Sequence, residues 1–181
     1  MRIIVAPPDP AWPARYTVEA GRVQAALAPI LIDLHHIGST SIPGIFAKPV
    51  IDMLAEIHSP EAADGCAGAM RDLGYEIMGE FGIPGRRFFR KNNPEGVREF
   101  HVHAFRAGSP GVERHLAFRD YLRMHPEVAR TYSELKQRLA RENPDSMPAY
   151  TGGKHAYVQE TERLALEWRR KKSRDRNVEN P

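Results

Sequence analysis

Two segments of the chain contain residues whose types and spacing suit phosphate and metal chemistry. The longer one, from His35 to Met53, reads HHIGSTSIPGIFAKPVIDM. Its Gly38 lets a ligand approach the backbone closely, and Asp52 can hold a cation against phosphate oxygens. Three hydroxyl side chains that can donate hydrogen bonds follow the glycine: Ser39, Thr40 and Ser41. This pattern predicts a site for a phosphorylated ligand.

Known phosphate-binding loops do not describe this segment. A Walker A loop is excluded because Gly38 and Gly44 are too far apart and Ile45 occupies the position of its lysine. No G-x-G-x-x-G fingerprint occurs in the chain. Lys48 is expected in the pocket because the following Pro49 favours an extended backbone that leads to the aspartate.

The second segment, HVHAF, carries a pair of histidines. His101 and His103 project from the same face of an expected strand, and two imidazoles at this spacing can bind one metal ion. Imidazole suits zinc, manganese, iron or nickel better than magnesium. In the alternative interpretation, both histidines only donate hydrogen bonds or contact phosphate. The other histidines lack such a spacing partner and are interpreted as structural: His35, His36, His58, His115, His125 and His155.

Further basic residues are candidates for phosphate binding. Four cations flank Phe88 and Phe89, and some of them must point to the sheet face, where they can bind phosphate: Arg86, Arg87, Arg90 and Lys91. Arg87 and Arg90 are the selected candidates. The alternative is an edge strand that its cations protect from pairing. Lys154 follows two glycines in an expected loop at 150–154, where it either anchors a substrate or belongs to a plain turn.

The hydrophobic pattern predicts a mixed α/β (α+β) fold with a sheet covered by helices and a helical C-terminal part. A first helix should begin with Asp9 as N-cap and Pro10 at its first position. In the second strand, Asp52, Leu54 and Glu56 should share one face. The expected strands are 31–37, 49–57, 75–83, 86–91 and 98–105, and further helices are expected at 60–73, 112–125, 126–142 and from 155 onward.

Length and charge predict one domain over residues 1–168 and a basic tail at 169–181. The chain has 181 residues and a net charge of +3, and the tail contributes +4 (six basic minus two acidic residues), so the remainder carries −1. The tail is interpreted as a frayed or disordered helix end, and nucleic acid is not favoured as a partner. The single cysteine, Cys66, and the lack of an apolar span predict a cytoplasmic protein without a membrane partner.

The arrangement of strand, Gly-Ser, loop and strand with aspartate resembles the nucleotidyltransferase fold of the polymerase-beta type. More closely, the chain resembles the GrpB family, whose members include fusions to dephospho-CoA kinase. The resemblance rests on HIGSTSIPGIFAKPVIDM at 36–53, HVHAF at 101–105, RHLAFRDYLRMHP at 114–126 and YTGGK at 150–154. It implies that the strand with the histidines lies beside the strand with Asp52.

The chain departs from the superfamily in one position. Polymerase-type sites place a second acid two residues after the first, and Leu54 stands there. Glu56 shares the face but lies about 13 Å from Asp52, at roughly 3.3 Å per residue. A two-metal site needs ions about 4 Å apart held by several carboxylates, and this strand offers one clear ligand.

The resemblance therefore implies a nucleotidyltransferase-like protein that binds a nucleotide or other phosphorylated small molecule with a divalent metal, and transfers a nucleotidyl group to a small acceptor. Two alternatives stay open: a non-catalytic ligand-binding or accessory module linked to coenzyme A metabolism, and a metal-dependent hydrolase that uses histidine and aspartate. Magnesium or manganese is the expected metal, and zinc is compatible with the histidines. Asp52 and His103 are the expected catalytic residues, and the expected metal ligands are Asp52, His101 and His103. The residues expected to bind the phosphorylated ligand are Gly38, Ser39, Thr40, Ser41, Lys48, Arg87, Arg90 and Lys154.

Overall fold

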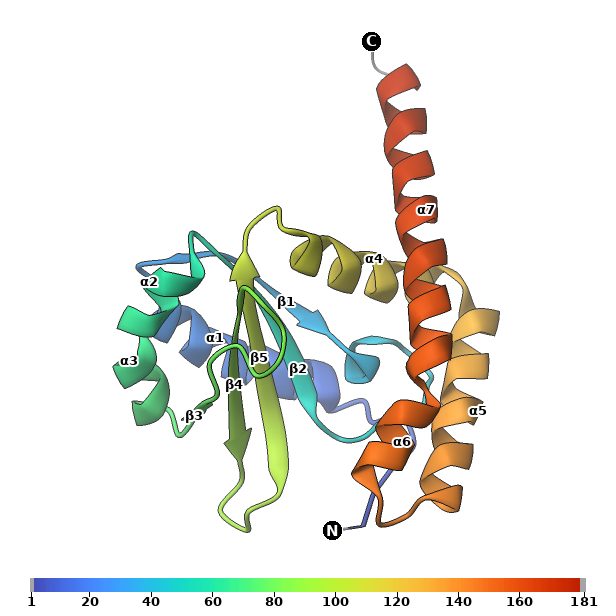
Figure 1. Cartoon of the computed structure of the whole chain (residues 1–181), viewed down its shortest axis with the longest axis horizontal. Coiled ribbons are helices and arrows are strands. Elements are labelled where there is room, and N and C mark those ends of the chain that lie inside the picture. Colours follow the sequence, from blue (N-terminus) through green and yellow to red (C-terminus); the bar gives the residue numbers. More distant parts are fainter. Residues whose placement is uncertain (1, 180–181) are drawn as a thin grey trace.

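A computed structural model describes residues 2–179, with side chains described as far as Asp175. Its centre is a five-stranded sheet in the order β1-β2-β5-β4-β3 (Figure 1). Strands β2 and β5 pair in parallel, and the other neighbours pair antiparallel. The strands are β1 (Leu31–Ile37), β2 (Ile51–Ile57), β3 (Glu76–Ile77), β4 (Arg86–Asn92) and β5 (Arg98–Arg106).

Helices cover both faces of this sheet (Figure 1). On one face lie α1 (Trp12–Leu27), α2 (Pro60–Gly65) and α3 (Ala67–Asp72). On the other face, α4 (Pro110–Met124) packs against β1, β2 and β5. The C-terminal part consists of α5 (Pro126–Glu142), α6 (Met147–Gly153) and α7 (His155–Glu179). This arrangement confirms the predicted mixed sheet flanked by helices.

The alternation along β2 separates an apolar face from the face that carries the polar candidates. Met53 is fully buried and packs in the main core with Val23 and Leu27 of α1. Leu54 points to the opposite face, where it joins a smaller cluster with Leu116 of α4. Because side chains alternate along a strand, Asp52 lies on the same face as Leu54, toward α4 and the C-terminal helices.

Three expected elements in the first half of the chain differ in the structure. Asp9 is not the N-cap of α1: Ala11 holds that position, and the Asp9 carboxylate accepts a hydrogen bond from the Ala11 N–H at 2.8 Å. The helix predicted at 60–73 is divided at Cys66 into α2 and α3. Of the strand predicted at 75–83, only β3 forms, because Gly79 and Gly82 adopt positive φ and turn the chain.

The C-terminal part is more helical than the sequence suggests. The loop predicted at 150–154 is mostly the end of α6, whose N-cap Ser146 accepts a hydrogen bond from the Ala149 N–H. The basic tail continues α7 as far as Glu179, because its arginines and lysines are good helix formers. Residues 180–181 of the predicted tail lie outside the described residues, and the division into domain and tail stays a prediction. None of the helices in the described range is both long and apolar enough to cross a bilayer.

Candidate functional site

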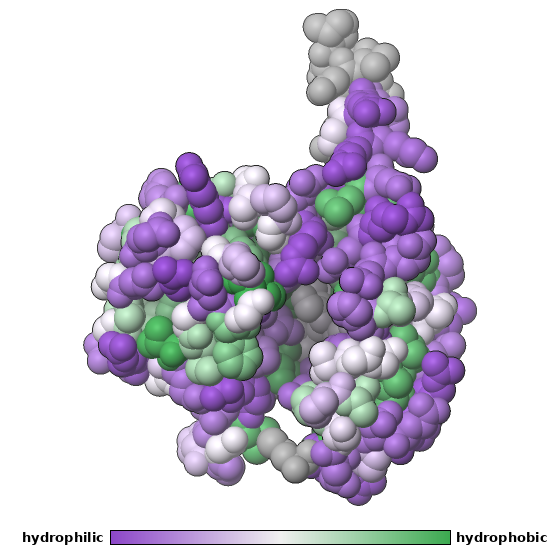
Figure 2. Space-filling view, viewed as in Figure 1, coloured by the Kyte–Doolittle hydropathy of each residue, from purple (hydrophilic) through white to green (hydrophobic). Residues whose placement is uncertain are grey.

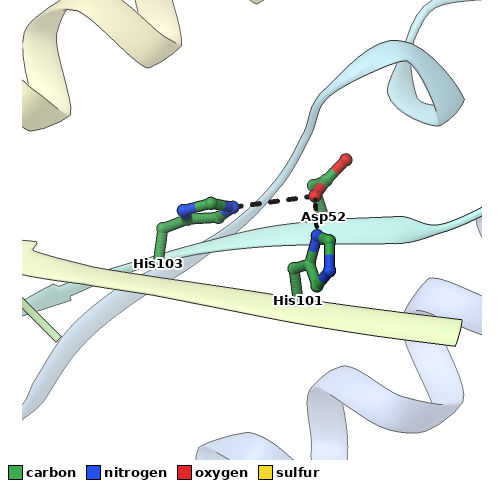
Figure 3. Close-up of side chains that lie close together, drawn as sticks. All are labelled: Asp52, His101 and His103. Atoms are coloured by element: carbon green, nitrogen blue, oxygen red, sulfur yellow. Dashed lines mark hydrogen bonds and ion pairs between the residues drawn. The ribbon is translucent and has the colours of Figure 1, made fainter. Parts of the chain in front are cut away.

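Asp52 and the histidine pair meet where β2 and β5 run side by side (Figure 3). The parallel register sets Asp52 opposite His101 and Leu54 opposite His103, so the three polar side chains share one face. The Asp52 Oδ1 atom lies 2.9 Å from Nδ1 of His101 and 3.6 Å from Nε2 of His103. The structure thus brings together the three residues that the sequence proposed as metal ligands.

The Asp52 carboxylate stays ionised despite its surroundings. Burial by itself raises the pKa of an acid, but the hydrogen bonds from His101 and His103 outweigh it and hold the pKa of Asp52 well below its usual range. Burial lowers the pKa of His103, which keeps its imidazole neutral. An anionic oxygen with partly exposed imidazoles beside it is a suitable ligand for a divalent cation.

The turn after β1 lies directly against this carboxylate. Gly38 follows Ile37, which pairs with Asp52 across β1 and β2. Its backbone has φ 69° and ψ −175°, a conformation that is essentially restricted to glycine. A Cβ atom at this position would stand 2.9 Å from the Asp52 Cβ atom and closer still to Oδ2. The glycine is therefore required both by its conformation and by the close approach of the carboxylate.

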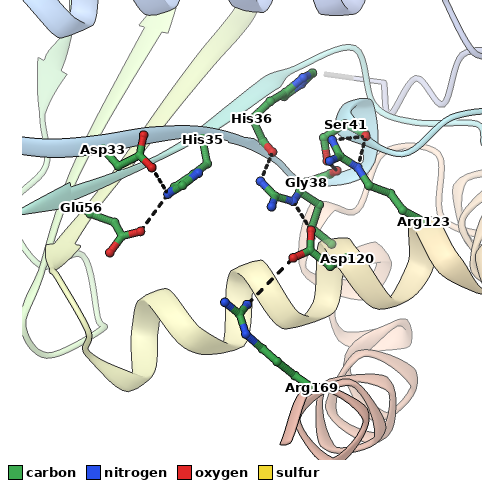
Figure 4. A network of polar contacts seen from close by, with 10 residues as sticks. Asp33, His35, His36, Gly38, Ser41, Glu56, Asp120, Arg123 and Arg169 are labelled. Carbon is green, nitrogen blue, oxygen red and sulfur yellow. Dashed lines mark hydrogen bonds and ion pairs between the residues drawn. The ribbon is translucent and has the colours of Figure 1, made fainter. Parts of the chain in front are cut away.

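Two arginines of α4 hold the backbone on either side of Gly38 (Figure 4). Arg123 donates from Nε and Nη2 to the Ser41 carbonyl oxygen at 3.0 and 2.8 Å. Arg119 donates from Nη1 to the His36 carbonyl oxygen at 3.3 Å and contacts Asp120 at 2.7 Å. These side chains stabilise the backbone on both sides of Gly38.

The loop hydroxyls divide into two groups. The Thr40 side chain is buried and donates to the Val50 carbonyl oxygen at 3.2 Å, and Ser41 donates to the Gly38 carbonyl oxygen at 2.7 Å. Both stabilise the turn. Ser39, in contrast, lines a cavity beside Asp52. Of the three predicted hydroxyl donors, the structure therefore brings one to the ligand side.

A cavity of about 230 Å³ opens above Asp52 between the sheet and the C-terminal helices. Besides Asp52 and Ser39 it is lined by His101, Tyr150 and three lysines: Lys48, Lys136 and Lys154. Figure 2 shows a hollow between these two parts of the molecule, with mainly hydrophilic side chains around it. Wider hollows occur elsewhere, including one of about 730 Å³ beside Arg15 and Lys91, but they lie away from Asp52.

The three lysines of the cavity are destabilised as cations. Burial, with a smaller contribution from the nearby charge of Lys154, lowers the pKa of Lys136 to about 7. Burial also lowers the pKa of Lys154 and Lys48, although the charge of Asp52 opposes this effect. An anion in the cavity would offset the mutual repulsion of these ammonium groups, so the electrostatics favour a polyanionic ligand.

Two predicted phosphate ligands are not brought to the cavity. Arg87 lies on the opposite face of the sheet, where its Nε and Nη2 atoms bind the Asp64 carboxylate of α2 at 2.7 and 2.9 Å. Arg90 shares the face of His101, but its guanidinium binds Glu76 of β3 at 2.7 Å. Arg87 therefore points away from the cavity, and the guanidinium of Arg90 is already paired with a carboxylate of the edge strand β3.

Sequence reasoning missed Lys136 at the site, and it named Arg86 among the cations beside Phe88 without selecting it as a site residue. Lys136 is 1% exposed, and its Nζ atom donates to the Phe46 carbonyl oxygen and lies 4.5 Å from the centre of the Tyr132 ring. It stands four residues after Tyr132, on the apolar stripe of α5. A lysine at such a core position is unusual, and this could have marked it as a candidate site residue. Arg86 is 6% exposed, and its Nη1 atom lies 3.4 Å from Nδ1 of His103.

The contact with Arg86 bears on how a metal would be held. One ligand atom from each of Asp52, His101 and His103 lies within 4.8 Å of the others, close enough for one ion. Because a guanidinium only donates, the Nδ1 atom of His103 accepts from Arg86 and its proton sits on Nε2, toward Asp52. If Nε2 of His103 bound a metal ion, the ring proton would have to sit on Nδ1, where it would face the guanidinium of Arg86. The arrangement therefore suits Asp52 and His101 as ligands, with His103 orienting Asp52.

Comparison with solved structures identifies the fold. The chain has the nucleotidyltransferase fold: it aligns with the GLD-2/RNP-8 complex at a TM-score of 0.55 and 12% identity, over 81% of this chain and 57% of that one. It also aligns with the Cid1 poly(U) polymerase bound to Mg 3'-dATP at a TM-score of 0.54 and 8% identity, over 82% and 49%. At these identities the likeness concerns the fold alone.

Within this class, the chain belongs to the GrpB family, whose model, described as "GrpB protein", matches residues 2–163. The crystal structure of the conserved protein GrpB from Enterococcus faecalis is 40% identical, with a TM-score of 0.85 over 91% of this chain and 98% of that one. The UPF0157 protein YqkA of Bacillus subtilis is 44% identical over 88% of this chain, and a UPF0157 protein of Pseudomonas aeruginosa is 40% identical over 87%. The chain spans 46% and 65% of the length of these two relatives.

Proposed function

We propose that this chain binds a nucleotide or another phosphorylated small molecule, together with a divalent cation, in the cavity above Asp52. The observation that carries this proposal is convergence: the Asp52 carboxylate, the Ser39 hydroxyl and three lysines line one cavity, and the Gly38 backbone packs directly against the carboxylate. The polyphosphate would lie between the lysines and Ser39, which offers a hydroxyl donor. The fold shared with nucleotide-bound structures supports the same assignment.

The cation would be held by Asp52 and by oxygens of the ligand's phosphates. Magnesium is commonly bound through one or two carboxylates plus substrate phosphates, so a single clear acid is sufficient for one ion. Bound there, the cation would supply charge neutralisation of the phosphate oxygens. His101 completes the site from β5, and His103 positions the Asp52 carboxylate.

As a reaction, we propose nucleotidyl transfer to a small acceptor. An acceptor oxygen forms a new bond to the α-phosphorus of a nucleoside triphosphate, while the bond from that phosphorus to the bridging oxygen breaks and pyrophosphate leaves. When Asp52 and the phosphate oxygens alone hold the cation, the imidazole of His101, whose ring lines the cavity, is free to accept the proton of the acceptor. In this reaction His101 is the catalytic histidine, although the sequence analysis expected His103. The reason is that His103 lies behind Asp52, against Arg86 and Phe88.

A second candidate function is ligand binding without turnover, and one observation favours it. Leu54, at the position of the second acid in polymerase-type sites, is fully buried with Ile37 and Phe105, so no carboxylate can replace it locally. In this case the pocket would bind a phosphorylated metabolite. Coenzyme A precursors are candidates, since a dephospho-CoA kinase of Mycolicibacterium paratuberculosis is 26% identical to 90% of this chain across 46% of its own length.

The test is a binding and turnover screen with Asp52→Asn. Nucleoside triphosphates and coenzyme A precursors are titrated by calorimetry with magnesium or manganese, and pyrophosphate release is followed. We expect at least one ligand to bind in a metal-dependent way and to lose ten-fold or more in affinity in Asp52→Asn. Asp64→Asn, an exposed aspartate on the opposite face, is the matched control and should bind as the wild type does. Binding without pyrophosphate would favour the second candidate, and unchanged binding by Asp52→Asn would refute both.

A further inference from the structure

A second group of metal-ligating side chains lies on the same sheet face, outside the cavity (Figure 4). Asp33 and His35 come from β1 and Glu56 from β2. The Nε2 atom of His35 lies 2.8 Å from Oε1 of Glu56 and 3.4 Å from Oδ2 of Asp33. All three ligand atoms lie within 4.8 Å of one another. His35, which the sequence suggested to be structural, thus stands between two carboxylates.

The strand pairing holds the carboxylates of Asp33 and Glu56 close together despite their electrostatic repulsion. Asp33 and Glu56 are direct partners in the antiparallel register of β1 and β2, and like charges in such a pair are destabilising. The register shifts between Leu31 and Asp33, immediately before the aspartate, and bulges commonly redirect a side chain. Among the described side chains, no lysine or arginine forms an ion pair with Asp33 or Glu56. The negative charge of this group is therefore left to the imidazole or to a cation from solution.

The spacing of the three side chains suits a small transition-metal ion. Two ligands bound to a tetrahedral zinc ion at about 2.0–2.1 Å are separated by about 3.3 Å. The two contacts of the His35 Nε2 atom, at 2.8 and 3.4 Å, bracket this separation. One imidazole and two carboxylates would leave a fourth position for water, and this mixed set suits zinc or manganese. Asp33 is the most exposed of the three, so an ion can enter from solvent on its side.

We propose that Asp33, His35 and Glu56 form a second divalent metal site, independent of Asp52, that ties the edge strand β1 to β2. An ion there would replace the repulsion between two opposed carboxylates with shared coordination. Strand β1 ends at Ile37, directly before Gly38, so the ion would stabilise the strand that carries the ligand-binding loop. This role does not require the cavity to be catalytic.

The experiment counts zinc equivalents by elemental analysis after equilibrium dialysis against zinc alone. Wild type, Glu56→Gln, Asp52→Asn and the double variant are compared, with exposed Glu95→Gln in the β4–β5 turn as the matched control. We expect Glu56→Gln to lose one zinc equivalent both in the wild type and in Asp52→Asn, which corresponds to at least a ten-fold loss of affinity at this site. Glu95→Gln should lose none. Because this difference is measured with and without Asp52, the second site and the proposed function fail separately.

A thermal readout distinguishes a metal site from a plain ion pair. Zinc binds only the folded form, so it should raise the Tm of Asp52→Asn. The double variant, which also carries Glu56→Gln, should show no such rise. If Glu56→Gln lowers the Tm in the presence of a chelator but leaves zinc stoichiometry and the zinc-induced rise unchanged, the group is only an ion pair and the proposal is refuted. If Asp52→Asn binds no more zinc than the double variant does, the proposal of a second metal site is also refuted.

Discussion

The sheet face toward α4 carries two clusters built by the same rule and placed in different surroundings. In both, a carboxylate on β2 lies beside a histidine on a neighbouring strand, and a third ligating side chain has its ligand atom within 4.8 Å of theirs. The Asp52 cluster lies on the inner pair β2–β5, and the Asp33 cluster lies on the edge pair β1–β2. Strand alternation contributes to both, because residues two apart on a strand point the same way, and the Asp33 cluster also needs the register shift that sets Asp33 opposite Glu56.

The surroundings separate the two clusters chemically. Above Asp52, the C-terminal helices contribute Lys136 and Lys154 to a walled cavity, so an anion and a cation are both accommodated. Beside Asp33, two carboxylates share one imidazole, and the described side chains add no cation. The difference teaches that ligand class is set by the elements that cover a cluster, since the ligating residues alone are nearly the same.

The largest expected effect comes from closing the space beside the inner cluster. Gly38→Ala would strain a glycine-only conformation and press a methyl group against Asp52, so we expect a loss of on the order of 3 kcal/mol in the free energy of unfolding. Metal-dependent ligand binding should be abolished, and zinc binding at Asp33 should persist if the variant folds. Chemical denaturation and calorimetry measure these effects.

Gly44→Ala is the matched control for this substitution. Gly44 also has positive φ, at 75°, but a Cβ atom there would meet nothing within 4 Å. It should cost about 1 kcal/mol, from backbone conformation alone, and leave ligand affinity unchanged. Equal losses in the two variants would mean that the contact with Asp52 contributes nothing.

A smaller effect is expected from the lysine cover. The pKa of Lys136 is about 7, so its ammonium group is charged below that pH and neutral above it. Tripolyphosphate affinity of the wild type should therefore fall as pH rises from 6 to 8.5. Lys136→Met should bind roughly ten-fold more weakly at pH 6 and show a flatter pH profile. Calorimetry across this range measures it, with exposed Lys171→Met as the control.

A second measurement on Lys136 fixes the sign of its effect on stability. In the unfolded chain this lysine has an ordinary pKa near 10.5, so between pH 7 and 10.5 the unfolded state binds more protons than the folded one. The unfolding free energy of the ligand-free protein should therefore rise with pH across this window. Lys136→Met should lack that contribution. A wild-type and variant slope that coincide would contradict the assigned burial of the charge.

The inner cluster was predictable from the sequence because it follows from local rules. Gly38 after an apolar strand, an aspartate inside the next strand and two histidines at alternate positions each indicate a polar face. That β5 lies beside β2, with Asp52 opposite His101, is a long-range pairing. Local periodicity does not specify strand order, and this adjacency came from the resemblance to the nucleotidyltransferase fold.

The cover of the cavity was not predictable to the same extent. Lys136 was overlooked because lysine is usually exposed, although its place on the apolar stripe of α5 marked it. The cluster at Asp33 depends on a one-residue register shift, which no turn or glycine in the sequence announces. In RRFFRK, adjacent arginines and adjacent phenylalanines hide which residues face the core, so the phase of β4 was open.

The smallest expected effect tests that phase directly. Arg87→Gln removes an ion pair with the exposed Asp64 on the face opposite to both clusters, so it should cost less than about 1 kcal/mol and leave ligand and zinc affinity unchanged. Arg86→Gln, one residue earlier, removes the contact with His103 and a buried guanidinium that donates to the Phe81 carbonyl oxygen at 2.8 Å. It should weaken metal-dependent ligand binding and lower the Tm more than Arg87→Gln does. If the two variants weaken binding equally, the face that β4 presents to the cavity is not the one that Arg86 occupies.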